Sequence, residues 1–332
     1  MSRNDMVSVI IPAYNAAATI SETLQCVRAQ THHNLDIIVI DDGSTDATAR
    51  IAAEHAATDG RIRITSKENG GVASARNLGV AMARSDFLAF VDADDLWAKS
   101  KIERELAVLK EGGPSVGLVY SWSARIDGTG HVIDDSYRPR YEGKVLQRLV
   151  QGNFMGNGSC ALVRRKAFDD AGGFEPGLRA AGFEGCEDML FYCRIAEHHE
   201  FAVAPAVLVG YRITPDNMSS DGTRMLGSWL IMVEEVVSRH PELALHLRTG
   251  VGHFACWLLN RALATRRINQ VPAILTRLIK FDAKLAAKVA MIDLPFVILE
   301  AARRKFRRWG RITAHTQVPS ARRHFLIQGG KC

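Results

Sequence analysis

The strongest constraint on the fold of this chain is an alternation of short apolar runs with helix-like segments near its beginning. Residues 7–11 and 35–40 are rich in Val and Ile, and each run ends abruptly, the first at Pro12 and the second at an Asp-Asp-Gly sequence. Between and after these runs, residues 15–30 and 46–57 have the spacing and capping residues of helices. This order predicts an α/β fold with a mostly parallel central sheet covered by helices on both faces.

Acidic residues follow two of the expected strands where each strand ends. Asp41-Asp42 closes the second run, and Asp92-Ala93-Asp94 closes a further strand expected at residues 87–91. In open α/β sheets, ligands bind at the carboxyl ends of the strands. We therefore expect both acidic clusters to line one crevice.

The sequence pattern changes near residue 220, where we place a domain boundary. Residues 1–220 divide into an α/β half at about 1–111 and a mixed half at about 112–220. Residues 221–332 are expected to form a helical region with a basic tail. Its helices are predicted from apolar residues at three-to-four spacing in three segments: 225–238, 243–265 and 271–281.

Charge and cysteine content exclude several classes of protein. The formal net charge is +6, but residues 301–332 hold nine Lys or Arg and no acid, so the rest of the chain is slightly acidic. A nucleic-acid partner is therefore not predicted. The six cysteines form no CxxC pair, and the chain begins without the apolar stretch of a secretion signal. We expect a cytoplasmic protein with no membrane-spanning helix.

The sequence Asp92-Ala93-Asp94 is a candidate metal site. Side chains two residues apart in an extended segment point the same way, so the two carboxylates share one face. Hard divalent cations such as Mn2+ or Mg2+ prefer such oxygen ligands and share their other positions with water and substrate phosphates. The alternative is a solvated acidic turn, because short strings of this kind are common.

The pair Asp41-Asp42 has two interpretations. A carboxylate here could accept hydrogen bonds from a nucleobase N–H or a ribose hydroxyl. Alternatively, the segment only caps the next helix, which accounts for Ser44 and Asp46 better than for the aspartate pair.

A glycine-rich segment precedes the helix expected at residues 72–83. Arg76 in the first turns of that helix is a cation suited to phosphate or base oxygens, although a plain glycine turn is the alternative. The segment after the first strand, residues 12–15, lacks the G-x-G-x-x-G pattern of dinucleotide binding, which disfavours a nicotinamide dehydrogenase.

Together these segments resemble the family 2 glycosyltransferases of the bacterial cell-surface polysaccharide type, which have the GT-A nucleotide-sugar-binding fold. Each motif is short, but the ordered set is specific and covers about residues 6–220. The similarity rests on six segments: VSVIIPAYN at 7–15, DDGSTD at 41–46, residues 69–79, FLAFVDADDLW at 87–97, GGF at 172–174, and Glu187-Asp188.

The resemblance implies an activity and a set of binding residues. A sugar would pass from a nucleotide-sugar donor, a UDP-sugar, to a hydroxyl of a glycan or lipid-linked acceptor, with a divalent metal and with inversion of the anomeric configuration. Residues 1–111 would then be the nucleotide-binding half and residues 112–220 the acceptor half. Three residues at the end of the first strand would pack around the nucleobase: Pro12, Ala13 and Tyr14. Asp42 would bind uracil, and Arg76 would lie on the nucleotide side.

The resemblance also assigns roles to the other carboxylates. Asp92 and Asp94, with Ala93 between them, occupy its DxD positions, Asp94 as the direct metal ligand and Asp92 as a ribose or indirect metal contact. Asp188 matches the position of the catalytic base, with Glu187 in support. Taken alone, two acids at a helix start are explained by the helix dipole.

One departure from the family pattern concerns the metal and diphosphate site. Members often carry Tyr-Arg-x-His after the base helix, whereas here Thr214 stands where that His would be. Thr214 could donate a hydrogen bond to a phosphate, or water could complete the metal shell. Arg212 is predicted either to contact the diphosphate or to be a salt-bridged surface residue.

The segment from 286 to 309 combines apolar residues with a cluster of Lys and Arg, and Phe306 and Trp309 lie among the charges. One interpretation is peripheral attachment to the anionic inner face of the cell membrane. The other is a solvated helix packed on the catalytic domain, and Pro295 is expected to kink or interrupt any continuous helix.

Two other classes of protein compete with the glycosyltransferase. A catalytically silent binding protein with the same fold is disfavoured by the intact Asp92, Asp94 and Asp188. A nucleotidyltransferase would more often show a basic glycine-rich loop directly after the first strand, which this sequence lacks.

Overall fold

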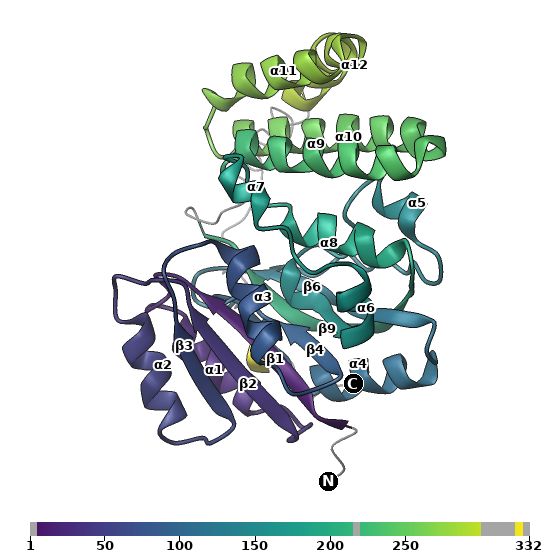
Figure 1. The fold of residues 1–332 in the computed structure, drawn as a ribbon. Coiled ribbons are helices and arrows are strands. Elements are labelled where there is room, and N and C mark those ends of the chain that lie inside the picture. Colours follow the sequence, from purple (N-terminus) through teal and green to yellow (C-terminus); the bar gives the residue numbers. More distant parts are fainter. Residues whose placement is uncertain (1–4, 215–219, 300–322, 328–332) are drawn as a thin grey trace.

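The computed structural model describes residues 5–214, 220–299 and 323–327. Figure 1 shows one twisted sheet flanked by helices, with a separate layer of helices stacked at one end of it. The helical layer is formed by residues after 220, so the expected succession of an α/β part and a helical part is present.

The first part of the sheet is parallel, as expected. Its strands are β1 (Val7–Ala13), β2 (Leu35–Asp41), β3 (Ile62–Ser66) and β4 (Phe87–Phe90), in the spatial order β3-β2-β1-β4. The connecting helices are α1 (Ile20–Arg28), α2 (Thr48–Ala56) and α3 (Val72–Met82). Every residue of β1, β2 and β4 is buried, which explains their continuous apolar sequence.

The helices α1 and α2 begin later than the sequence predicts. Ala16 N–H donates to Thr48 Oγ1 at 2.7 Å and Ala17 N–H donates to Asp46 Oδ2 at 3.0 Å, which holds the chain in a loop before α1. Asn15 has a positive φ of 47°. Asp46 and Thr48 therefore join two loops, and neither Ser44 nor Thr45 caps α2, whose first residue is Thr48.

The second part of the sheet mixes strand directions. β8 (Ala161–Arg164) runs antiparallel between β4 and β6 (Val116–Ile126), and β9 (Glu200–Arg212) runs parallel to β6. Two short strands complete it: β5 (Leu96–Trp97) and β7 (Val132–Asp134). We did not predict β9, which has Pro205 in its interior. The β6/β9 register is irregular beside this proline, and such irregularities accommodate a residue that cannot donate to the ladder.

The remaining helices cover the sheet and build the helical layer. Those within residues 98–199 are α4 (Lys101–Glu111), α5 (Leu146–Leu149), α6 (Arg165–Asp170), α7 (Gly177–Ala180) and α8 (Glu187–Ala196). Those of the layer are α9 (Gly222–Arg239), α10 (Ala244–Ala264), α11 (Gln270–Phe281) and α12 (Ala283–Lys288). One hydrophobic cluster runs from Tyr120 in the sheet through Leu190 to Trp229 and Leu258, so the layer shares a core with the α/β part.

The chain after α12 continues as a π-helical turn at Val289–Asp293 and a helix to residue 299. A wider turn directly before Pro295 accommodates the missing proline N–H without breaking the helix. Among the described residues, no helix is long and apolar enough to cross a membrane. Residues 300–309 of the segment predicted to bind membranes, which hold its cluster of Lys and Arg, lie outside the described residues.

Candidate active site

The carboxyl edge of the parallel strands gathers the predicted nucleotide residues. β1 lies between β2 and β4 in the sheet, so its end is flanked by both acidic clusters. Pro12 and Ala13 are buried at the end of β1, and the following Tyr14 is 53% exposed. Because Tyr14 is a large aromatic side chain with half of its surface free, it is available for stacking on a planar ligand.

The carboxylate of Asp42 is buried and is largely used by the protein itself. Its Oδ1 accepts hydrogen bonds from Lys67 Nζ at 2.7 Å and Gly70 N–H at 2.9 Å, and its Oδ2 accepts from Gly71 N–H at 2.7 Å. Gly71 has a φ of 88°, which favours glycine at this turn. Asp42 thus shapes the loop before α3, in addition to the nucleobase contact predicted for it.

The turn that carries the DxD sequence is held by its backbone. Asp92 N–H donates to Ser159 Oγ at 3.0 Å, and Thr23 Oγ1 is 3.0 Å from the carbonyl oxygen of Ala93 and 2.9 Å from that of Asp95. Asp95 Oδ2 accepts a hydrogen bond from Ser159 Oγ at 2.6 Å. These contacts fix the turn without using the carboxylates of Asp92 and Asp94.

The two DxD carboxylates have different partners. Asp92 Oδ1 accepts from Arg76 Nη2 at 2.6 Å, whereas no ion pair among the described residues involves Asp94. Burial and the charge of Asp92 raise the pKa of Asp94 to about 6. Burial, Asp94 and Asp92 raise the pKa of Asp95 well above its ordinary value. Burial is the larger cause of both shifts and the neighbouring carboxylates add to it, so a cation bound at this turn would favour the ionised forms.

These residues fit a hard divalent cation that is bound mainly through its substrate. Asp94 offers unpaired carboxylate oxygens, the ligand type that Mn2+ and Mg2+ prefer. Within residues 5–214, 220–299 and 323–327, no group of three or more His, Cys, Asp or Glu could hold a metal ion. Among the described residues, Asp94 would therefore be the direct protein ligand, with Asp92 next to it and the remaining positions filled by phosphate and water.

Arg76 links the DxD turn to the predicted base. Its side chain is buried, its guanidinium lies 5.1 Å from the centre of the Phe174 ring, and Gly158 leaves it room because any Cβ there would lie 2.5 Å from Nη2. Burial alone would lower the pKa of Arg76, but the charges of Asp92 and Asp188 more than offset it. Arg76 therefore pairs with one carboxylate of the site and interacts through its charge with a second.

Glu187 and Asp188 begin α8 but face different surroundings. Glu187 is buried, and both of its oxygens accept from Gly185 N–H, at 2.9 and 3.0 Å. Asp188 is partly exposed and accepts only from Met189 N–H at 2.8 Å. Although part of Asp188 is exposed, the surrounding protein keeps most water away from its carboxyl group, and this desolvation, offset in part by Arg76, raises its pKa to about 7. Of the two acids, Asp188 is the one poised to exchange a proton near neutral pH.

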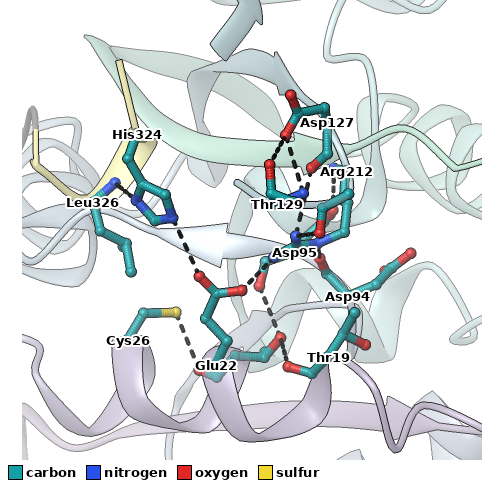
Figure 2. A network of polar contacts seen from close by, with 12 residues as sticks. Thr19, Glu22, Cys26, Asp94, Asp95, Asp127, Thr129, Arg212, His324 and Leu326 are labelled. Atoms are coloured by element: carbon teal, nitrogen blue, oxygen red, sulfur yellow. Dashed lines mark hydrogen bonds and ion pairs between the residues drawn. The ribbon is translucent and has the colours of Figure 1, made fainter. Parts of the chain in front are cut away.

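Arg212 is salt-bridged, as one of its two interpretations predicts, but its side chain is 1% exposed and therefore buried, not on the surface. The predicted diphosphate contact stays a prediction. Nε donates to the carbonyl oxygen of Asp94 at 2.7 Å, and Nη2 pairs with Glu22 Oε2 at 2.7 Å. Figure 2 shows this arginine together with Asp94, Asp95 and Glu22 in one network of polar contacts. Thr214 is partly buried and precedes the undescribed residues 215–219, and its predicted role stays a prediction.

Sequence analysis missed three residues that organise the site: Thr23, Ser159 and Glu22. Each contacts the acidic turn or its arginine from a distant part of the chain, and none belongs to a motif that marks such a role.

The comparisons with known proteins agree with this geometry. The family model described as glycosyl transferase family 2 matches residues 8–172. A putative teichuronic acid biosynthesis glycosyltransferase of Bacillus subtilis is 39% identical over 126 residues, 37% of this chain and 50% of that protein. The chain belongs to glycosyl transferase family 2. It spans only 33 to 38% of the length of the first three curated relatives that it matches.

Solved structures confirm the GT-A fold. TarS 1-349 of S. aureus in complex with UDP-GlcNAc has a TM-score of 0.59 at 17% identity, covering 82% of this chain and 79% of that chain. The mannosyltransferase PcManGT of Pyrobaculum calidifontis in complex with GDP-Man and Mn2+ has a TM-score of 0.57 at 20% identity, covering 90% and 86%.

Proposed function

We propose that this family 2 chain transfers a sugar from a UDP-sugar to a hydroxyl group of a glycan or lipid-linked acceptor, with a divalent metal and with inversion at the anomeric carbon. The observation that carries the proposal is that the buried Arg76 pairs with Asp92 of the DxD turn and that its charge also interacts with Asp188. This arrangement offers a diphosphate-metal site and a carboxylate base within one site.

Donor binding is assigned to the end of β1 and the loop after β2. Tyr14 would stack on the uracil ring, with Pro12 and Ala13 beside it, and the free lone pair of Asp42 would accept from the uracil N–H. TarS was solved with UDP-GlcNAc and PcManGT with GDP-Man, so relatives in fold accept either base. The choice of UDP is therefore the part of the proposal that needs a direct test.

Asp94 would bind the metal directly, and Asp92 would contact the ribose or the metal indirectly. A bound divalent cation would offset the negative charge that builds on the departing diphosphate. Arg76 holds Asp92 in place and is positioned to keep the surroundings of Asp188 from becoming too negative for ionisation. Both effects act on groups that face the donor.

Asp188 would act as the general base. It removes the proton of the acceptor hydroxyl while the oxygen attacks the anomeric carbon, and the bond to the diphosphate breaks in the same step. A single displacement of this kind inverts the anomeric configuration. Glu187 supports the base by closing the turn at Gly185, which fixes the first turn of α8.

Calorimetric titration of the purified protein with UDP, GDP and NAD, each with Mn2+ and with EDTA, tests the proposal. We expect UDP to bind in the presence of Mn2+ and to bind much more weakly in EDTA. Preference for GDP would change the donor class. Failure to bind any nucleotide would contradict the proposal and favour a silent protein with this fold.

We also propose peripheral attachment to the inner face of the cell membrane. In addition to the basic residues of the tail sequence, the described end of the helical layer exposes apolar side chains and lysines. The apolar ones are Ile279, Met291, Ile292, Phe296, Ile298 and Leu299, and the exposed lysines are Lys280, Lys284 and Lys288. Apolar residues bordered by Lys suit an anionic lipid surface.

Co-sedimentation with anionic and neutral liposomes tests this attachment. We expect the double substitution I292E/F296E to reduce binding to anionic vesicles severalfold, whereas I133E, at an exposed isoleucine of β7, leaves it unchanged. Equal sedimentation of both variants and the unmodified protein would show that this surface does not bind lipid.

A further inference from the structure

Arg212, at the end of β9, holds the acidic turn through hydrogen bonds to Asp94 and Asp95. The Arg212 backbone N–H donates to Asp95 Oδ1 at 2.9 Å, and its Nε donates to the carbonyl oxygen of Asp94 at 2.7 Å. Nη1 donates to the carbonyl oxygen of Gly128 at 2.6 Å. One residue thus ties the end of β9 and the loop after β6 to the turn, as Figure 2 shows.

This arrangement requires an arginine. A guanidinium presents donors in a rigid planar fork, so Nε, Nη1 and Nη2 reach three acceptors in fixed directions. A lysine ammonium has no such fork and cannot hold the Asp94 carbonyl and the Glu22 carboxylate in the same geometry. Since Arg212 is 1% exposed, solvent does not compete for these contacts.

We propose that Arg212 is a positioning residue that sets the direction of the Asp94 carboxylate toward the metal and diphosphate. The Asp94 carbonyl belongs to the residue whose side chain is the predicted metal ligand. Fixing its peptide group fixes the direction in which Cβ leaves the backbone, while the side chain itself stays unpaired. This inference rests on the proposed metal-dependent donor site.

The contacts of Arg212 continue through Glu22 to the last described segment of the chain. Glu22 Oε2 pairs with Arg212, and Glu22 Oε1 lies 3.5 Å from His324 Nε2. His324 belongs to a short segment, residues 323–327, that docks beside β7. The carbonyl oxygen of Arg323 accepts a hydrogen bond from Val132 N–H at 3.0 Å, and Phe325 N–H donates to the Gly130 carbonyl oxygen at 2.9 Å.

Two glycines make room for this docked segment. A Cβ at Gly130 would lie 2.5 Å from His324 Nε2, and a Cβ at Gly210 would lie 2.9 Å from the Phe325 ring, which is buried. Gly130 also has a φ of 82°. Arg212 contacts Asp94 directly, Glu22 contacts Arg212, and His324 contacts Glu22. The effect of a substitution on the direction of the Asp94 carboxylate should therefore decrease from Arg212 to Glu22 and then to His324.

The test measures UDP binding by calorimetry, in Mn2+ and in EDTA, on R212M, R212K, E22Q and H324A. We expect R212M to weaken Mn2+-dependent UDP binding by at least about tenfold, R212K and E22Q by less, and H324A least. Binding in EDTA should stay within about twofold in all four, because the nucleobase contacts are intact.

R164M is the matched control. Arg164 in β8 also donates to three backbone carbonyl oxygens, those of Val116, Leu109 and Gly113, without touching the acidic turn. We expect it to lower the melting temperature as R212M does but to keep Mn2+-dependent binding.

Four outcomes would overturn the inference. R212M and E22Q binding with unmodified affinity in Mn2+ would show that Arg212 does not position Asp94. An equal loss in R164M, or an equal loss in EDTA and in Mn2+, would show a purely structural role. Absence of Mn2+-dependent UDP binding in the unmodified protein would overturn both the inference and the proposed function.

Discussion

The acidic turn after β4 and the acidic pair at the end of β2 lie at the same edge of the sheet, yet the protein uses the carboxylates of Asp42 and Asp94 differently. Asp42 accepts from two backbone N–H groups and a lysine, so its charge orders a loop. At the other turn, the backbone and Asp95 make the structural contacts, and Asp94 has no ion pair among the described residues. A carboxylate is available for a ligand where other groups hold the turn.

The same division separates the two acids that begin α8. Glu187 is buried on the amide of Gly185, whereas Asp188 is partly exposed and titrates near neutral pH. The protein thus places an acid that orders a loop close to an acid that is available for chemistry. The following predictions test this contrast, from the largest effect to the smallest.

Replacing the available acid of α8 should have the largest effect. In D188N we expect turnover to fall by about 10³-fold, because no base removes the acceptor proton, while Mn2+-UDP affinity stays within about threefold. Steady-state release of UDP and calorimetry measure the two quantities. E187Q is the matched variant and should lose stability more than it loses turnover. Near-normal turnover of D188N would show that the base is another residue.

Replacing the available acid of the turn should act on metal-dependent binding. In D94N we expect UDP affinity in Mn2+ to fall by about 100-fold, with little change in EDTA, because a charged metal ligand is lost. Thermal unfolding should change little, since Asp94 makes no ion pair. An unchanged ratio of affinities in Mn2+ and EDTA would remove Asp94 from the metal site.

The pH dependence should follow Asp188. Its raised pKa of about 7 means that the carboxylate form, which accepts the proton, is populated above that pH. We therefore expect kcat to rise about tenfold per pH unit below the pKa and to level off above it. A pH-rate profile at saturating donor, Mn2+ and acceptor measures this. A profile that is flat between pH 5.5 and 8, or that falls as the pH rises, would contradict the assignment.

Replacing the acid that orders a loop should have the smallest effect on metal dependence. In D42N we expect a loss of stability of about 1–3 kcal/mol, because the amides of Gly70 and Gly71 lose a charged acceptor. UDP affinity should decline by a similar factor in Mn2+ and in EDTA. Calorimetry with thermal unfolding measures both. A loss of UDP affinity that occurs in Mn2+ but not in EDTA would place Asp42 at the metal. It would contradict the difference in role between Asp42 and Asp94.

The position of the acidic clusters could be predicted from the sequence, because apolar runs that end in aspartates fix where the strands end. Their division of roles could not. Asp42 receives its amides from residues 28 and 29 positions away, and Asp94 is held by an arginine 118 positions away. These contacts depend on the sheet order and on β9, a strand that we did not predict.

The most direct test of the contrast is a titration of Mn2+ by electron paramagnetic resonance in the presence of saturating UDP, for the unmodified protein, D94N and D42N. We predict that D94N loses bound Mn2+ while D42N retains it at near-unmodified affinity. Retention of Mn2+ by D94N together with its loss in D42N would contradict the account.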